Sequence, residues 1–205
     1  YRSWYDFDPK YKGGYRSWWG FETLPEVNEE NPSYVEFITG EGGVIDTWLR
    51  RGAAGFRLDV ADELPDDFIE KIRAAVKRVS PEKFLLGEVW EDATTKYGFG
   101  QRRTYLLGKG LDSVMNYPFK NAVLDFVKGK PAEQAMGEIL SICEHYPAPA
   151  MDTALNFLST HDTERALTVI ADEPANGRGR EWQSGRCVTG EAYEEGMLRL
   201  RMAYA

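Results

Sequence analysis

The sequence is poor in the two residues that build most disulfide scaffolds and zinc sites. Among 205 residues it has only two cysteines and two histidines. Cys143 and Cys187 allow one bridge at most, which excludes a small disulfide-stapled domain, so we expect two free, buried thiols. Neither a Cys-x-x-Cys nor a His-Glu-x-x-His pattern occurs, and with only His145 and His161 a histidine-rich metal site is excluded.

A surplus of positive charge and a long apolar run are also missing. Asp and Glu number 33 against 25 Lys and Arg, which gives a formal net charge of −8 and argues against nucleic acid as a partner. No apolar stretch approaches the roughly 20 residues that span a bilayer, so we expect no membrane partner. Hydrophobic residues make up 42% of the chain, which favours one folded core over disorder.

Aromatic residues, in contrast, are abundant near the start of the chain. Residues 1–32 hold Trp4, Trp18 and Trp19 among several tyrosines, interrupted by Gly13-Gly14 and by prolines. We expect an irregular lobe, with two interpretations left open. Its rings either pack against one another or form a platform for the flat apolar faces of a ligand such as a sugar, since aromatic rings bury large areas.

Beyond this lobe, the apolar residues alternate between helical and strand periodicity. The cap-and-proline pair at 31–32 predicts a helix that runs to about residue 51, and "DDFIEKIRAAVKRV" at 66–79 predicts an amphipathic helix. The other expected elements are strands at 55–60, 84–90, 111–116 and 154–160, helices at 119–128, 132–145, 163–171 and 191–204, and a polar loop at 172–190. In helix 132–145 the inward residues should be Met136, Ile139, Leu140 and Cys143. The order predicts an α/β fold with parallel strands and crossover helices.

Three of the predicted strands end at a carboxylate. The first ends in Asp59, the second in Glu88, and the fourth in the pair His161-Asp162. Each has a structural explanation. Asp59 or Asp62 would also cap the helix that follows, Asp162 would also cap the next one, and Glu88 would also serve as an ion-pair partner. In a parallel sheet, however, catalytic groups gather at the carboxyl ends of the strands, so we expect these side chains to lie together.

Paired carboxylates beside a fixed cation suit the cleavage of glycosidic bonds. One carboxylate attacks the anomeric carbon in its ionised form, while the other donates a proton to the leaving oxygen. Arg57 lies two residues from Asp59 and on the same side of a strand, which favours the anionic, nucleophilic form of Asp59. Glu88 stands between Leu86 and Trp90, and this apolar company with an anion nearby favours the protonated form that an acid/base needs.

Four short motifs resemble the α-amylase family, glycoside hydrolase family 13. They are "LPEVN" at 24–28, "GFRLDVADE" at 55–63, "GEVW" at 87–90 and "FLSTHD" at 157–162, in the order of that family, and "WWGFETLPEVNEENP" looks most like its neopullulanase and cyclomaltodextrinase branch. The resemblance implies a partial TIM (β/α)8 barrel with about strands four to seven and their helices. It also implies two parts, with residues 1–32 a remnant of the inserted B-domain lobe and residues 33–205 the partial catalytic barrel.

The resemblance assigns roles to the three carboxylates. Asp59 aligns with the family's nucleophile, Glu88 with its general acid/base, and Asp162 with the residue that stabilises the transition state and binds sugar hydroxyls. The implied reaction is retaining hydrolysis of α-1,4 links in starch-like glucans, maltooligosaccharides or cyclodextrins, with α-1,6 links also open. The same carboxylates serve an α-glucosidase or a glucanotransferase. A non-catalytic carbohydrate-binding relative is the alternative from another class, but such a relative should lack at least one of the three.

Four further residues match substrate-binding positions of the family. Arg57 matches the arginine that supports the nucleophile, and His161 matches the histidine that binds the same sugar as Asp162. Glu63 and Trp90 stand where the neopullulanase branch shapes adjoining subsites. The resemblance therefore implies an α-glucan oligosaccharide as the partner of the site.

The sequence also departs from the family's pattern. The Asn-His pair of the third barrel strand and the glycine-proline signature of the eighth are absent, and the chain starts at Tyr1 without a methionine or a signal sequence. We therefore interpret it as an internal fragment, with the compartment open and the cytoplasm favoured. We expect no cofactor or metal here, with calcium binding by the intact protein left open. We also expect weak or no hydrolysis by the fragment, and a homodimer that covers the open half-barrel surface, which light scattering tests.

Overall fold

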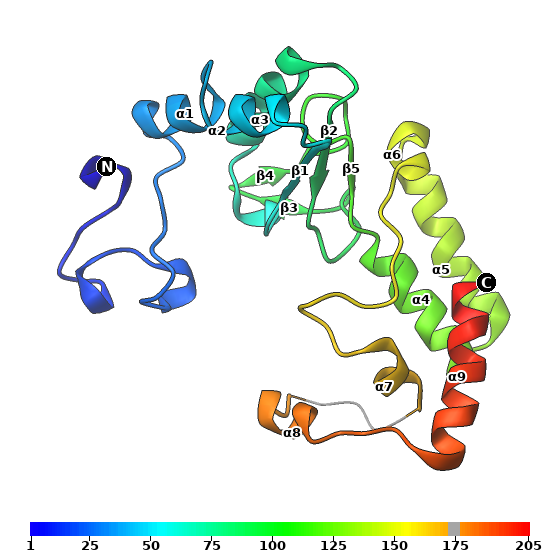
Figure 1. Ribbon diagram of the computed structural model, residues 1–205. Helices are drawn as coiled ribbons and strands as arrows, with labels where there is room; N and C mark the ends of the chain where they lie inside the picture. The colour runs from blue at the N-terminus through cyan, green and yellow to red at the C-terminus, as the bar shows by residue number, and fades with distance from the viewer. Residues whose placement is uncertain (172–176) are drawn as a thin grey trace. The chain divides into compact units, whose positions relative to one another are not determined.

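The computed structural model describes residues 1–171 and 177–205, and Figure 1 draws its helices and strands. The chain forms two compact units. The first holds Tyr1–Glu88 together with Thr95–Asp112, and the second holds Val89–Thr94 together with Ser113–Ala205. The residues predicted to carry chemistry are therefore divided between the two units.

The first 32 residues form the irregular segment that the aromatic pattern predicts. They contain three short 3-10 helices, at Arg2–Trp4, Lys12–Gly14 and Trp18–Gly20, and two isolated antiparallel bridges. Part of the aromatic content packs internally, since the ring centroids of Tyr1 and Trp4 lie 4.7 Å apart and those of Trp18 and Phe21 lie 6.2 Å apart. Trp19 stays 77% exposed, so internal packing does not account for every ring.

The helix predicted from residue 31 to about 51 consists of two helices, α1 (Pro32–Thr39) and α2 (Val44–Arg50). Its start is confirmed, because the Asn31 side chain accepts hydrogen bonds from two of the peptide N–H groups that follow it. The break falls at the glycines between the two helices. Gly42 has a φ of +74°, a left-handed conformation that a residue without Cβ adopts at little cost.

A parallel strand pair with an intervening helix forms the centre of the first unit. β1 (Gly55–Leu58) pairs with β2 (Phe84–Gly87), and Leu58 lies opposite Gly87 at the end of the pair. Between them, α3 (Asp66–Val79) has the bounds that the sequence predicts, and it buries an apolar face of Phe68, Ile69, Ile72, Ala75 and Val76. Both strands end earlier than predicted, so the carboxylates that follow them lie in loops.

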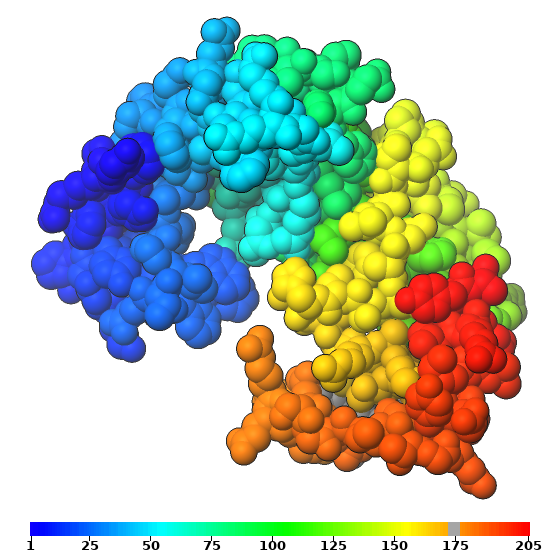
Figure 2. Space-filling model, viewed as in Figure 1, coloured from blue at the N-terminus to red at the C-terminus, as the bar shows by residue number. Residues whose placement is uncertain are grey.

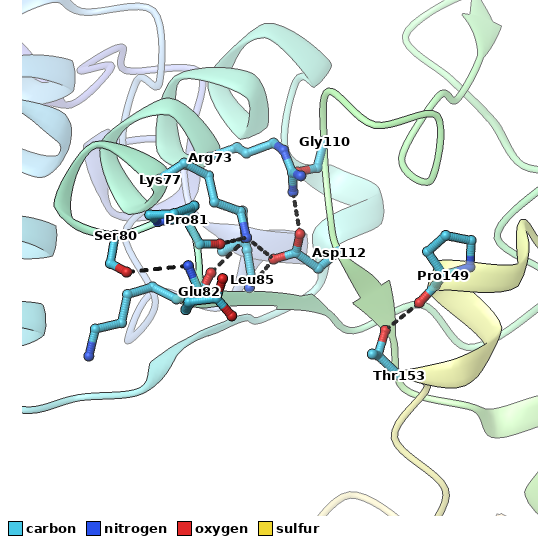
Figure 3. Close-up of polar contacts among 11 residues, drawn as sticks. Arg73, Lys77, Ser80, Pro81, Glu82, Leu85, Gly110, Asp112, Pro149 and Thr153 are labelled. Atoms are coloured by element: carbon cyan, nitrogen blue, oxygen red, sulfur yellow. Dashed lines mark hydrogen bonds and ion pairs between the residues drawn. The ribbon is translucent and has the colours of Figure 1, made fainter.

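An ion-pair cluster around Asp112 connects β2 to α3 (Figure 3). The Asp112 carboxylate lies 2.7 Å from Arg73 and 2.8 Å from Lys77, and it accepts a hydrogen bond from the peptide N–H of Leu85 at 2.8 Å. Burial alone would raise the pKa of Asp112, but the hydrogen bonds from Lys77 and Arg73 outweigh burial, and the pKa is lowered. The cluster thus holds the strand that leads into Glu88.

Two short elements of the first unit were not predicted. A 3-10 turn, η4 (Ala61–Glu63), follows β1, and a hairpin pairs β3 (Tyr97–Gly98) with β4 (Gln101–Arg102) in antiparallel register. The hairpin lies in a Gly-rich segment that reads as a loop in the sequence. Directly after it, the guanidinium of Arg103 bonds to η4, so the loop and the turn are connected.

The second unit is mainly helical. Its elements are β5 (Ser113–Val114), α4 (Tyr117–Val127), α5 (Ala132–His145), α6 (Ala148–Asp152), α7 (Ala166–Ala171), α8 (Arg180–Ser184) and α9 (Gly190–Tyr204). α9 packs against α7 and α4, and a core cluster contains Leu124, Val127, Leu158, Ala166 and Ile170. Much of α9 stays exposed, and Figure 2 shows it in red on the surface. Within the described ranges, no helix has the length and apolarity needed to cross a membrane.

Two predicted segments of the second unit differ from the structure. The strand expected at 154–160 is reduced to a single parallel bridge between Leu155 and Met115. The polar loop expected at 172–190 contains α8, and its residues 172–176 lie outside the described part of the chain. The sequence thus places these segments, but it overstates one strand and misses two short helices, α6 and α8.

The predicted inward face of α5 is wrong. The buried positions of this helix are Ala135 and Ile142, whereas Met136 and Leu140 are 53% and 51% exposed and Cys143 is exposed. α5 packs against α4, and the predicted Ile139 is half-buried and lines a cavity with Met136 and residues of α4. Both cysteines are free as expected, but they are exposed rather than buried.

Candidate active site

The structure brings Asp59 and Glu88 together at the ends of β1 and β2. These residues directly follow Leu58 and Gly87, which lie opposite each other in the parallel pair. The peptide N–H of Glu88 donates a hydrogen bond to the carbonyl of Leu58 at 2.9 Å, so the ladder continues to this point. The two acidic residues therefore occupy neighbouring positions at the carboxyl end of the strands.

Arg57 of β1 connects the two carboxylates. Its Nη1 contacts Oδ1 of Asp59, and its Nη2 lies 3.0 Å from Oε2 of Glu88. The second contact is an ion pair without hydrogen-bond geometry, since Nη2 is buried and finds no hydrogen-bond acceptor among the described residues. One guanidinium thus contacts both carboxylates.

The two carboxylates differ sharply in exposure. The side chain of Asp59 is 74% exposed, whereas that of Glu88 is 4% exposed. Glu88 also accepts a hydrogen bond from the peptide N–H of Val60 at 2.8 Å. The apolar surroundings predicted for Glu88 agree with its burial, but a guanidinium and a peptide N–H lie against its carboxylate. An open carboxylate suits a group that reaches a substrate carbon, and a buried one suits a group that exchanges a proton in a restricted space.

Glu88 also holds the turn that follows Asp59. Val60 has a φ of +42°, a left-handed conformation that is a genuine outlier for a β-branched residue and costs on the order of 1–3 kcal/mol. The side chain of Glu88 bonds to the N–H of Val60, and its carbonyl accepts from the N–H of Ala61 at 3.1 Å. These two bonds offset the strain of the turn.

Glu63 is bound by protein groups of the first unit. Its two carboxylate oxygens accept hydrogen bonds from the indole N–H groups of Trp18 and Trp19, the latter at 2.9 Å. Trp18, Asp59 and Glu63 line one cavity of about 410 Å3. Glu63 therefore lies near Asp59, and both of its oxygens already have tryptophan donors.

The second unit holds the other predicted residues. Nε2 of His161 lies 3.0 Å from Oδ2 of Asp162, and their side chains are 74% and 42% exposed. Trp90 stacks on Tyr117 with ring centroids 4.3 Å apart and an interplanar angle of 14°. Trp90, His161 and Asp162 line one cavity of about 870 Å3. The predicted site residues thus form two groups, one in each unit.

Arg103 was missed by the sequence reasoning. Its side chain is fully buried and lies 2.9 Å from the carboxylate of Asp66, and it donates hydrogen bonds to the carbonyls of Asp62 and Leu64, both at 2.6 Å. It therefore holds η4, the turn that carries Glu63. An arginine in a Gly-rich segment gives no local sign of burial, because its acceptor Asp62 lies 41 residues away in the sequence.

Lys120 was missed as well. It lines the cavity of the second unit together with Trp90 and Asp162. Burial lowers the pKa of Lys120, and the charges of Asp125 and Glu164 counteract this only in part. A partly desolvated ammonium beside Asp162 is a candidate hydrogen-bond donor to a ligand in that cavity.

The family follows from comparison with known proteins. Residues 4–184 match the alpha-amylase family, catalytic domain. The chain belongs to the alpha-amylase family. The resemblance carried by the four sequence motifs is thereby confirmed.

Curated relatives in the alpha-amylase family are longer than this chain. An amylopullulanase from Thermoanaerobacter thermohydrosulfuricus is 36% identical over 207 residues, which cover 87% of this chain and 13% of that enzyme. A cyclomaltodextrinase from a Bacillus species is 37% identical over 155 residues, 72% of this chain and 25% of that enzyme. Neopullulanase 2 from Thermoactinomyces vulgaris is 34% identical over 157 residues, 76% of this chain and 25% of that enzyme. The chain thus spans a quarter or less of the length of these relatives.

Solved structures of alpha-amylase-family enzymes share the fold. The cyclic alpha-maltosyl-(1→6)-maltose hydrolase from Arthrobacter globiformis superposes with a TM-score of 0.73 at 27% identity, covering 83% of this chain and 38% of that one. A cyclomaltodextrinase gives 0.69 at 32% identity, with 83% and 29% covered. These neighbours are TIM barrels, so the predicted partial (β/α)8 barrel is confirmed. The described residues form an α/β piece with parallel strands and no closed barrel.

Metal binding in this alpha-amylase-family chain stays a matter of prediction. Over residues 1–171 and 177–205, no three His, Cys, Asp or Glu side chains are grouped so that they could hold a metal ion. The expectation that no metal or other cofactor binds here needs a direct metal analysis of the purified protein.

Proposed function

We propose that the intact protein is a retaining glycoside hydrolase that cleaves α-1,4 glucosidic bonds of starch-like glucans, maltooligosaccharides or cyclodextrins. The observation that carries this proposal is the contact of Arg57 with both Asp59 and Glu88. Retaining enzymes keep their two carboxyl groups roughly 5–5.5 Å apart, whereas inverting enzymes need roughly 6.5–9.5 Å to admit a water molecule. Contact of both carboxylates with one guanidinium makes them neighbours, which supports the arrangement of a retaining enzyme.

In the proposed reaction, the two carboxylates perform successive steps. Asp59, which is largely exposed, attacks the anomeric carbon while Glu88 donates a proton to the leaving oxygen. A covalent glycosyl-enzyme forms on Asp59, and Glu88 then takes a proton from the water that hydrolyses it. Arg57 stabilises the charge of Asp59 before attack and after release.

The residues of the second unit are assigned to substrate binding and transition-state stabilisation. By the family motif, Asp162 stabilises positive charge on the sugar ring and binds its hydroxyls, and His161 binds hydroxyls beside it. Trp90 offers a ring that is 45% exposed, which suits contact with the apolar face of a sugar. The support for these roles is that all three side chains are accessible and line one cavity.

The proposal also covers the type of glucan and the bond that is cleaved. The names of the relatives include amylopullulanase, cyclomaltodextrinase and neopullulanase, which supports α-1,4 bonds in branched and cyclic glucans and keeps α-1,6 bonds as a second class. An α-glucosidase or a glucanotransferase is the alternative within the family. Chromatography of the products from starch, pullulan and a cyclodextrin separates these activities, because a transferase gives products longer than its substrate.

The stereochemistry of the first product tests the proposal. We expect proton NMR of the intact protein with maltoheptaose to show newly formed reducing ends that appear first as the α-anomer and equilibrate afterwards. Initial release of the β-anomer would indicate inversion, and it would contradict nucleophilic attack by Asp59.

A further inference from the structure

The carboxylate of Glu63 binds two consecutive tryptophans. Its Oε2 accepts the indole N–H of Trp18, and its Oε1 accepts that of Trp19 at 2.9 Å. An indole N–H is a donor only, and a carboxylate is the strongest acceptor among protein side chains. Each oxygen therefore has one charge-assisted bond to one ring. In a glutamine at this position, one of the two oxygens would be replaced by an NH2 group, which cannot accept an indole N–H.

The backbone is shaped to make this pairing possible. Side chains of consecutive residues in an extended chain point to opposite sides. Trp19 instead has a φ of +51°, a conformation that costs a non-glycine residue energy and persists only where its surroundings fix it. The ring centroids of Trp18 and Trp19 lie 5.4 Å apart with an interplanar angle of 29°. The two rings therefore stack on each other, and both donate to the carboxylate of Glu63. Backbone hydrogen bonds close this turn, and Glu63 adds a side-chain contact to both of its rings.

The backbone turn that carries Glu63 is held by Arg103. This turn, η4, is bonded to the buried guanidinium of Arg103 through the carbonyls of Ala61, Asp62 and Leu64. The same guanidinium is paired with a carboxylate at the start of α3. Arg103 therefore connects the start of α3 to the turn that carries Glu63, and Glu63 in turn bonds to the two indoles.

Of the two rings bonded to Glu63, Trp19 is open to solvent and Trp18 is half-buried. Trp19 is 77% and Phe21 is 56% exposed. Trp18 stacks with Phe21 as well as with Trp19, at 6.2 Å and 28°. Trp18 also lines the 410 Å3 cavity that includes Asp59. Three stacked rings thus extend from that cavity to the exposed surface, where the apolar side of a flat ligand fits.

We propose that Glu63 is a positioning residue, which fixes Trp18 and Trp19 as a stacking surface for one glucosyl ring of an α-glucan. This inference rests on the proposed function, which supplies the ligand class. A glucosyl ring presents C–H groups on its flat faces, and aromatic rings bind such faces at low cost in conformational entropy. Glu63 then acts on the substrate through the tryptophans, and its own oxygens stay on the indoles.

The first experiment tests the positioning itself on the 205-residue chain. Trp18→Phe and Trp19→Phe identify the two indole N–H signals in a 15N–1H spectrum. We expect Glu63→Ala to shift both signals upfield, and Glu63→Gln to shift one of them, because the amide nitrogen that replaces one of the two oxygens cannot accept an indole N–H. Glu29→Gln is the matched control, since Glu29 lines the same cavity. If Glu63→Ala leaves both signals in place, the inference is overturned.

The second experiment tests the stacking surface by titration of the same chain with maltoheptaose. Trp19→Ala should weaken binding about tenfold, as expected for loss of one aromatic contact. Trp48→Phe, a change at an exposed ring elsewhere in the first unit, should leave binding unchanged. Glu63→Ala should weaken binding by a similar factor, but it should add nothing in a Trp18→Ala, Trp19→Ala background. A full additional loss in that background would show direct sugar binding by Glu63 and would contradict the inference.

The two proposals fail in different ways. Unchanged maltoheptaose binding by Trp19→Ala, or no binding by the wild-type chain, overturns the stacking surface and leaves the chemistry of Asp59 to be judged by product stereochemistry. Conversely, the intact protein could hydrolyse no glucan while Trp19→Ala still weakens glucan binding by the 205-residue chain. That pair of results would support the stacking surface and refute the hydrolase.

Discussion

The peptide N–H of Val60 donates a hydrogen bond to Oε2 of Glu88 at 2.8 Å, and Val60 adopts a left-handed φ of +42°. The turn after Asp59 and the carboxylate of Glu88 are therefore coupled through one bond. Because Arg57 contacts the same oxygen of Glu88, a change at any of these positions should be felt at the other two.

Val60→Gly should be more stable than Val60→Ala. Both variants lose the same apolar side chain, but only glycine adopts a positive φ without strain, so we expect a difference of about 1 kcal/mol in the free energy of unfolding. Urea denaturation of the two variants measures it. At a position with an ordinary helical φ the order would be reversed, and such a reversal here would contradict the left-handed conformation of Val60.

Arg103→Ala should destabilise the first unit strongly. It leaves the Asp66 carboxylate and several carbonyls without their buried donor, and loss of one partner of a buried ion pair costs about 3–5 kcal/mol. Arg103→Lys should lose less, because it keeps the charge but not the planar fork. Arg199→Ala, which removes an exposed pair with Glu195 on α9, is the control and should cost about 0.5 kcal/mol. Equal effects of Arg103→Ala and Arg199→Ala on the denaturation midpoint would refute the role of Arg103.

The cluster around Asp112 should make the fold sensitive to acid. The pKa of Asp112 is lowered in the folded chain, so its stabilising contribution is present above the ordinary carboxyl pKa of about 3.9 and is lost as the pH falls through the folded value. We expect Asp112→Asn to be less stable than wild type at neutral pH, with a gap that shrinks towards acid. Denaturation midpoints of both proteins, measured from pH 7 into the acid range, give this difference in stability. A difference that widens in acid would contradict a lowered pKa of Asp112 in the folded chain.

The sequence predicts local structure well where one helix face decides it. α3 follows its apolar face and charged ends, and the carboxylates at the ends of β1 and β2 follow from the parallel order. The inward face of α5 could not be predicted, because contact with α4 decides which apolar residues are covered. The partners of Glu63 could not be predicted either, since Trp19 lies 44 residues away and nothing local pairs them.

Asp59→Asn should abolish hydrolysis by the intact protein. The amide cannot form the glycosyl ester, so we expect kcat on maltoheptaose to fall more than about a thousandfold. Asp67→Asn, at an exposed carboxylate on α3, should change kcat little. If the intact protein hydrolyses no glucan, and both variants bind glucans as well as the wild type does, the protein is the non-catalytic relative instead. The presence of Asp59, Glu88 and Asp162 together disfavours that outcome.

Covalent trapping identifies the side chain that attacks the anomeric carbon. The intact protein is incubated with a 5-fluoro-α-glucosyl fluoride, which forms the glycosyl-enzyme faster than water hydrolyses that intermediate. The labelled protein is then digested with a protease, and its peptides are mapped by mass spectrometry. The proposed chemistry predicts one fluoroglucosyl adduct, on the peptide that contains Asp59 and on that side chain. An adduct on Glu88 or Asp162, or steady turnover of the reagent with no adduct on any carboxylate, would contradict it.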